Sequence, residues 1–158
     1  MKRTARPVVA PNTDVATITE DTIRSFAGYN IKRAFNVVQT DLNRTLKPFG
    51  LRMVTFTALA LIVDNPGLRL SQLAQSLGIE RPNLVVIVDD LEARDLITRD
   101  KVPQDRRAYA LHATLAGRVL RDKSVAAVEE HEKRVYSAVT EAEIRALVQV
   151  LRKIESNG

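Results

Sequence analysis

A short segment, residues 71–90, constrains the fold of this chain more than any other part of the sequence. It reads Ser-Gln-Leu-Ala-Gln-Ser-Leu-Gly-Ile-Glu-Arg-Pro-Asn-Leu-Val-Val-Ile-Val-Asp-Asp. Apolar residues recur at helical spacing on both sides of Gly78, which supplies the backbone freedom that a tight corner needs. Ala74, Gly78 four residues later and Leu84 six residues after that give the spacing of a helix-turn-helix. Such a unit presents its second helix to the major groove of DNA.

Helical periodicity continues on both sides of this segment. Apolar residues recur every three to four positions, which predicts one long helix from about 15 to 46 and a second from about 52 to 64. Residues 68–70 fit a short strand. After the helix-turn-helix, two short runs at 96–99 and 109–112 flank a charged stretch and predict a β-hairpin. A helix-turn-helix followed directly by a hairpin is a winged helix.

Polar residues mark where helices are expected to begin. We expect Ser71 to cap the first helix of the helix-turn-helix, and Thr114 to cap a helix from 115 to about 138. Thr140 and Glu143 have the spacing of a capping box, which opens the last helix. The sequence therefore predicts a mainly α fold with a small β-hairpin wing, in which a winged helix-turn-helix is joined to further helices.

Composition excludes several classes of function. The chain has 158 residues, 45% of them hydrophobic, which is enough for a globular core. It has no cysteine and only two, widely separated histidines, so we expect no metal site and no cofactor. The sequence offers no set of nucleophile, base and orienting residue and no phosphate-binding glycine loop. We therefore expect that the protein is not an enzyme.

Charge and hydropathy indicate the kind of partner. The net charge of +5 and the isoelectric point near 9.8 are compatible with a phosphate-bearing partner such as double-stranded DNA. No apolar run approaches the length of a membrane span, and no apolar segment follows the basic N-terminus. We therefore expect a cytoplasmic protein without a membrane partner.

Four segments between residues 68 and 117 carry a recognisable pattern. They are Leu70-Ser71-Gln72-Leu73-Ala74, Val88-Asp89-Asp90-Leu91-Glu92-Ala93-Arg94-Asp95-Leu96-Ile97, Asp105-Arg106-Arg107 and Ala113-Thr114-Leu115-Ala116-Gly117. With these segments the chain resembles the MarR family of bacterial transcription regulators. The Asp-Arg-Arg wing combined with the Thr-x-x-Gly helix start is fairly specific, and helix order extends the resemblance over about 15 to 156. The resemblance implies a homodimer that binds a pseudo-palindromic operator and is released by a small ligand.

The resemblance also implies a division into four parts. These are a flexible N-terminal arm (1–13), an N-terminal dimerisation helix (14–50), a winged helix-turn-helix DNA-binding domain (51–113) and C-terminal dimerisation helices (114–158). The last helix has the 3-4-3 spacing of a helix–helix seam. The predicted dimer residues are Ile23, Ile144, Leu147, Leu151 and Ile154. The alternative is that these residues pack within one chain as a helical bundle.

The second helix of the helix-turn-helix supplies the first group of candidate DNA contacts. Its outward positions include Arg81, Pro82, Asn83, Val85 and Val86. Arginine pairs with guanine and asparagine with adenine in the major groove, and a surface valine pair can contact thymine methyl groups. The alternative is that the valines pack beneath the wing or lie on the surface without contacting DNA.

The wing and the start of the first helix supply a second group of candidates. The cations around the hairpin are Arg99, Lys101, Arg106 and Arg107. The resemblance implies that Asp105 braces the hairpin while an arginine enters the minor groove, which attracts arginine where it is narrow. The alternative is a solvated charged turn. Ser71 and Gln72 lie at a helix N-terminus, whose N–H groups can bind a phosphate, although Ser71 could serve only as a cap.

Aromatic residues indicate where a small ligand could bind. Five of the seven aromatic residues lie between positions 26 and 56. The candidate ligand-binding residues are Phe26, Tyr29, Arg33, Phe56 and His112, with Arg44 and Arg52 as further cationic contacts. Such a set would suit an aromatic acid or its acyl-CoA thioester. The alternative is that these aromatics fill an ordinary core.

The sequence thus predicts a sequence-specific transcriptional regulator, a repressor of the MarR type, that leaves its operator when a small ligand binds. One alternative is an architectural protein that binds DNA without sequence preference, and the modest net charge disfavours it. Another is a winged helix that binds only protein partners. Substitution of the candidate arginines separates this last class from the first.

Overall fold

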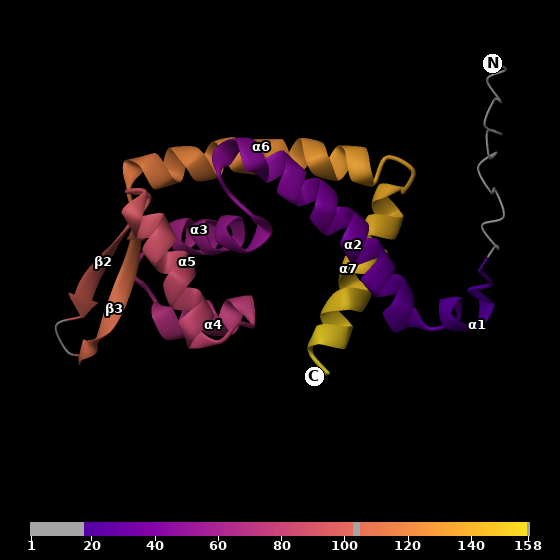
Figure 1. Ribbon diagram of the computed structural model, residues 1–158, viewed down its shortest axis with the longest axis horizontal. Coiled ribbons are helices and arrows are strands. Elements are labelled where there is room, and N and C mark those ends of the chain that lie inside the picture. The colour runs from indigo at the N-terminus through magenta and orange to yellow at the C-terminus, as the bar shows by residue number, and fades with distance from the viewer. Residues whose placement is uncertain (1–17, 103–104, 158) are drawn as a thin grey trace, which may run out of the picture. The chain divides into compact units, whose positions relative to one another are not determined.

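The computed structural model describes residues 18–102 and 105–157, and the side chains of 18–101 and 109–157 (Figure 1). Its elements are α1 (Asp21–Arg24), α2 (Ala27–Leu46), the 3-10 helix η1 (Lys47–Phe49), α3 (Met53–Asp64), β1 (Leu68–Arg69), α4 (Leu70–Leu77), α5 (Arg81–Ala93), β2 (Ile97–Val102), β3 (Asp105–Ala113), α6 (Leu115–Val135) and α7 (Glu141–Glu155). Two compact units divide the chain, Met1–Ala34 and Phe35–Gly158, and each is considered by itself. The arm predicted at residues 1–13 lies outside the described residues.

The first unit corrects the prediction of one continuous helix from about 15 to 46. The helix is interrupted after α1, and α2 begins at Ala27. Side chains compete with the helical backbone at this break. The Ser25 hydroxyl donates to the Thr22 carbonyl at 2.7 Å, and the Asn30 amide donates to the carbonyls of Arg24 and Phe26 at 2.8 and 2.9 Å. These hydrogen bonds stabilise the interruption, although neither of the two residues between the helices, Ser25 and Phe26, is a proline or a glycine.

Helices α3, α4 and α5 of the second unit pack around one apolar core, as the helical periodicity predicted. The fully buried side chains of these helices include Leu59, Ile62, Leu73, Leu84, Val88 and Leu91. Gly78 ends α4 in the left-handed conformation, with φ of 61°, and its N–H bonds back to the carbonyls of Ala74 and Gln75. Ile79 then packs against the core, so α5 leaves the corner at the position the sequence predicted.

A three-stranded antiparallel sheet completes the winged helix. The strand order is β1-β3-β2, and Leu68 pairs with Leu111 while Ile97 pairs with Ala113. The hairpin strands are longer than the predicted runs at 96–99 and 109–112. Most of the additional residues are charged, and they show no regular apolar alternation, but the backbone ladder of an exposed hairpin needs none.

Two of the three predicted helix caps are confirmed. The Thr114 hydroxyl accepts the N–H of Gly117 at 3.0 Å and begins α6, and Thr140 exchanges capping-box hydrogen bonds with Glu143 at the start of α7. The predicted cap at Ser71 is wrong. The N-cap is Arg69, two residues earlier, and its N–H donates to Oε1 of Gln72 at 2.9 Å.

Helix α6 ends at Val135, a few residues before the predicted end, and α7 follows after a short turn. Among the described residues, no single helix has the length and apolar composition of a membrane span. Only the bent pair of α2 with η1 and α3 meets those criteria jointly, by length and composition alone.

Candidate DNA interface and adjacent groove

The outer face of α5 carries the residues predicted to read DNA. All of them are exposed: Arg81, Pro82, Asn83, Val85 and Val86. Glu80 is the N-cap, so Arg81 and Pro82 occupy the first turn, where a proline leaves no helical hydrogen bond unmade. The side chain of Val86 is 68% exposed, so it does not pack beneath the wing. The helix therefore offers both hydrogen-bonding and apolar groups to a partner.

Arg99 joins the wing to α5. Its Nε lies 2.8 Å from Oε2 of Glu92, and its guanidinium also pairs with Asp89. The Arg99 side chain is only 18% exposed. This cation is therefore paired with two carboxylates of the recognition helix, and it fixes strand β2 against that helix. The pairing also offsets negative charge that would otherwise face a phosphate-bearing partner.

The remaining candidates for DNA contact lie on the wing and in the first turn of α4. Lys101 is exposed on β2. The backbone of Asp105, Arg106 and Arg107 belongs to β3, but their side chains lie outside the described residues. Ser71 and Gln72 are exposed in the first turn of α4, and Gln72 uses its carbonyl oxygen to accept the N–H of Arg69.

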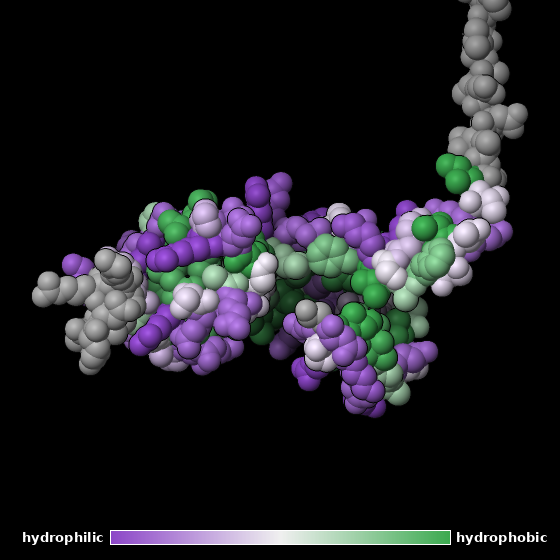
Figure 2. Space-filling view, turned by 90° about the horizontal axis from the view of Figure 1, so that it is seen from below, coloured by the Kyte–Doolittle hydropathy of each residue, from purple (hydrophilic) through white to green (hydrophobic). Residues whose placement is uncertain are grey.

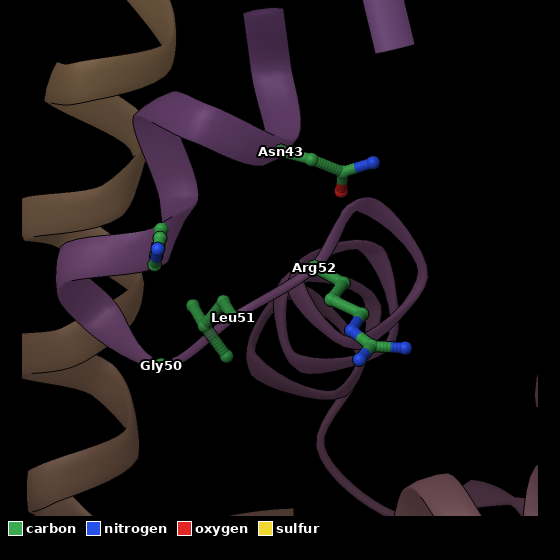
Figure 3. A pocket seen from close by; sticks show the side chains of 5 residues that line it. Asn43, Gly50, Leu51 and Arg52 are labelled. Carbon is green, nitrogen blue, oxygen red and sulfur yellow. The ribbon is translucent and has the colours of Figure 1, made fainter. Parts of the chain in front are cut away.

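A groove of about 570 Å³ opens beside the turn between α2 and α3 (Figure 3). It is lined by Asn43, Lys47, Gly50, Leu51 and Arg52. Asn43 accepts the N–H of Met53 at 2.9 Å, which ties α2 to the start of α3. Figure 3 shows the side chains of Asn43 and Arg52 extending toward the same side. With Lys47 and Arg52 both exposed, the groove has the size of a small-molecule site and two cations for an anionic ligand.

An ion-pair cluster around the buried His131 joins α2 to α6 within the second unit. Nδ1 of the fully buried His131 lies 2.8 Å from Oδ2 of Asp41, and Nη2 of Arg134 lies 2.7 Å from the same oxygen. Arg44 pairs with the other carboxylate oxygen. Hydrogen bonds from His131, Arg134 and Arg44 favour the ionised carboxylate and hold the pKa of Asp41 well below its usual range.

Helix α7 carries an apolar surface. Leu147, Leu151 and Ile154 are 45%, 39% and 51% exposed, and Ile144 is half-buried. Figure 2 shows apolar side chains at the surface in the part of the molecule that carries this helix. The predicted dimer residue of the first unit, Ile23, is 43% exposed. Within the described residues, α7 contributes no fully buried side chain.

The winged helix with an exposed recognition helix has clear relatives. A sequence model of the MarR family matches residues 51–109. The solved structure of the transcriptional repressor CouR bound to a 23-mer DNA duplex is 32% identical, with a TM-score of 0.84. The match covers 87% of this chain and 98% of that one. The chain belongs to the MarR family.

A second structure of CouR and one further relative also match most of the chain. CouR bound to p-coumaroyl-CoA is 30% identical with a TM-score of 0.79, over 87% of this chain and 97% of that one. A protein of Thauera aromatica, assigned as a transcriptional regulatory protein for the hcr operon, is 28% identical over 144 residues, 90% of this chain and 87% of that one. The predicted fold class and family are confirmed, and the chain is a MarR-type transcriptional regulator.

The five predicted ligand residues are not among the described residues that line the groove. Phe26, Tyr29 and Arg33 belong to the first unit, where the Tyr29 hydroxyl donates to Glu20 at 3.0 Å. In the second unit, Phe56 packs partly buried against the core, and Nε2 of His112 lies 3.6 Å from Asp100.

The groove is lined by Arg52, one of the further cations named from the sequence, and by two polar residues that were not named as candidates. Asn43 and Lys47 carry no aromatic signal, and only the turn at Lys47-Pro48-Phe49-Gly50 brings them beside Arg52. A proline–glycine turn between two helices, flanked by cations, was the available sequence signal for this groove.

Proposed function

We propose that the protein is a homodimeric repressor that binds a pseudo-palindromic operator and leaves it when an anionic aromatic ligand binds. The observation that carries this proposal is the exposed outer face of α5, held to the wing by Arg99. The likeness to CouR, whose structure is known with a DNA duplex, supports the assignment of DNA as the partner.

On α5, Arg81 and Asn83 would reach guanine and adenine edges, while Val85 and Val86 would contact thymine methyl groups. Lys101 and the first turn of α4 would contact phosphates, which position the protein but carry no sequence information. Asp105, Arg106 and Arg107 stay candidates for the wing tip. In this proposal Arg99 acts through its carboxylate partners and orients the wing.

The proposed effector is an aromatic acyl-CoA thioester, with a free aromatic acid as the weaker candidate. Lys47 and Arg52 beside the groove would pair with phosphate oxygens of the coenzyme. The relative CouR is known bound to p-coumaroyl-CoA, which supports this class of ligand. The aromatic set Phe26, Tyr29, Arg33, Phe56 and His112 stays a prediction for the acyl portion.

The proposed dimer places two recognition helices about one DNA turn apart, so that both half-sites are bound together. The apolar positions of α7, with Ile23 of the first unit, would form the seam. An effector lowers DNA affinity only if it binds one conformation of the dimer more tightly than the other. The predicted four-part division of the chain, with dimerisation helices at both ends, belongs to this proposal.

Selection from a random DNA duplex pool tests DNA recognition. The wild-type chain is expected to select a pseudo-palindrome, and Arg81→Ala or Asn83→Ala is expected to weaken binding to it by about 1–3 kcal/mol, which corresponds to 5- to 150-fold. Arg145→Ala is the matched control, because Arg145 pairs only with Glu141 of its own helix among the described contacts. A pool without a consensus, or unchanged binding by both α5 variants, would contradict the proposal.

Fluorescence anisotropy of the selected duplex tests the effector. Titration with p-coumaroyl-CoA is expected to release DNA at lower concentrations than titration with p-coumaric acid or with coenzyme A alone. Lys47→Ala and Arg52→Ala should each raise the p-coumaroyl-CoA concentration needed for release by about tenfold, because each variant loses one charge-assisted contact to the ligand. Equal potency of the free acid and the thioester would exclude the coenzyme from the groove.

A further inference from the structure

The C-terminal end of α5 is fastened to the wall of the groove by one side chain. Arg94 follows directly after α5. Its Nη1 donates to the carbonyl of Gly50 at 2.9 Å, and its Nη2 donates to the carbonyl of Phe49 at 3.0 Å. A third contact, to Oδ2 of Asp90 within α5, is longer at 3.4 Å. The guanidinium thus binds two successive carbonyls of a turn distant in sequence.

The turn that Arg94 holds is also a wall of the groove. Gly50 and Leu51 both line it, and the Leu51 side chain is buried. Lys47, at the start of the same turn, lines the groove as well. A ligand that displaces this turn therefore also displaces the two carbonyls that Arg94 binds.

We infer that Arg94 is the positioning residue that transmits occupation of the groove to the recognition helix. This inference rests on the proposed effector groove and assigns its route of regulation. The planar guanidinium binds both carbonyls at once, which a lysine ammonium on a flexible stem cannot reproduce. When the turn moves, the end of α5 must move with it or lose both hydrogen bonds. Either outcome changes how α5 presents Arg81, Asn83 and the valines to DNA.

The absence of cysteine from the sequence provides a test that needs no natural ligand. A Lys47→Cys chain carries a single thiol at the groove, and N-(1-pyrenyl)maleimide attached there is a defined aromatic occupant. Carbamidomethylation of the same thiol with iodoacetamide is the small control. The readout is hydrogen exchange, followed by mass spectrometry, in peptides covering residues 88–96 at the end of α5.

Pyrene attachment is expected to raise the hydrogen-exchange rate of residues 88–96 by about fivefold or more, which is the lower end of ordinary allosteric couplings. The small carbamidomethyl label is expected to leave this rate unchanged. With Arg94→Gln added, the effect of pyrene should fall below about twofold. Arg94→Lys keeps the charge and should behave like Arg94→Gln. It replaces Arg94→Gln in the experiment if that variant does not fold. Asp90→Asn, which leaves both carbonyl contacts intact, should keep the full response.

An equal response to pyrene in the Arg94→Gln and wild-type backgrounds would overturn the inference, as would no response with Arg94 present. Calorimetric titration of the unlabelled chain with p-coumaroyl-CoA separates the two proposals. If p-coumaroyl-CoA does not bind, the proposed effector is wrong, while the labelled chain still decides whether Arg94 connects the groove to α5.

Discussion

Gly117 is required by a close approach between α6 and the end of the turn before β2. A Cβ at this position would lie 2.0 Å from the carbonyl oxygen of Leu96, which is backbone and cannot yield cheaply. We expect Gly117→Ala to lower the free energy of unfolding by about 3 kcal/mol, as overpacking of a tight site does. Chemical denaturation measures this change. Gly28→Ala is the control, because a Cβ there meets no atom within 4 Å, and a loss of stability equal to that of Gly117→Ala would contradict the argument.

The pH dependence of stability should reflect Asp41. Hydrogen bonds from His131, Arg134 and Arg44 lower the pKa of this carboxyl group in the folded protein. Its contribution is therefore fully present above the ordinary aspartate pKa and is lost as the pH falls through the lowered folded-state value. The difference in Tm between wild type and Asp41→Asn should be largest at neutral pH and shrink as the pH falls below about 4. A difference that grows on acidification would contradict this assignment.

At the scale of elements, the sequence predicts a helix well where a capping residue and an apolar period agree. Thr114 and Thr140 begin α6 and α7 as expected, and Leu84, Val88 and Leu91 lie inward on α5. The break between α1 and α2 was not predictable from the period, since Ser25 and Asn30 act through side-chain hydrogen bonds that many helices lack. The full length of the hairpin escaped prediction because backbone pairing alone extends it.

The contact between β2 and α5 yields a prediction about how Arg99 acts. If Arg99 orients the wing through Glu92, then Arg99→Gln and Glu92→Gln should not be additive in their effect on DNA affinity. Coupling of roughly 0.5–3 kcal/mol is expected for residues in direct contact. Fluorescence anisotropy with the selected duplex on the four chains of this cycle gives the coupling. Fully additive losses would mean that Arg99 contacts DNA independently of the recognition helix.

At the scale of the whole molecule, the outer face of α5 follows more directly from the sequence than the lining of the groove does. Arg81, Asn83 and the valines share one face of one helix, and a helical period suffices to find them. The groove joins Asn43 near the end of α2 to Arg52 at the start of α3, and its shape follows from how an intervening turn folds. A count of aromatic residues carries no information about such a turn, so it could not indicate the groove, and the aromatic set itself stays a prediction.

The apolar face of α7 yields the prediction on which operator binding depends. Leu147 and Leu151 are exposed in the protomer and would be buried in the proposed dimer, so a glutamate at either position would place an unpaired charge in the seam. Leu147→Glu and Leu151→Glu are expected to sediment as monomers in analytical ultracentrifugation. Because each half-site would then be bound singly, affinity for the selected palindrome should fall by about 10²–10⁴-fold, while binding to an isolated half-site should not change. Gln149→Glu adds the same charge at an exposed polar position of α7 and should preserve the dimer. If the two leucine variants sediment as the wild type does, α7 is not the seam, and the spacing of the two recognition helices must be set by another surface.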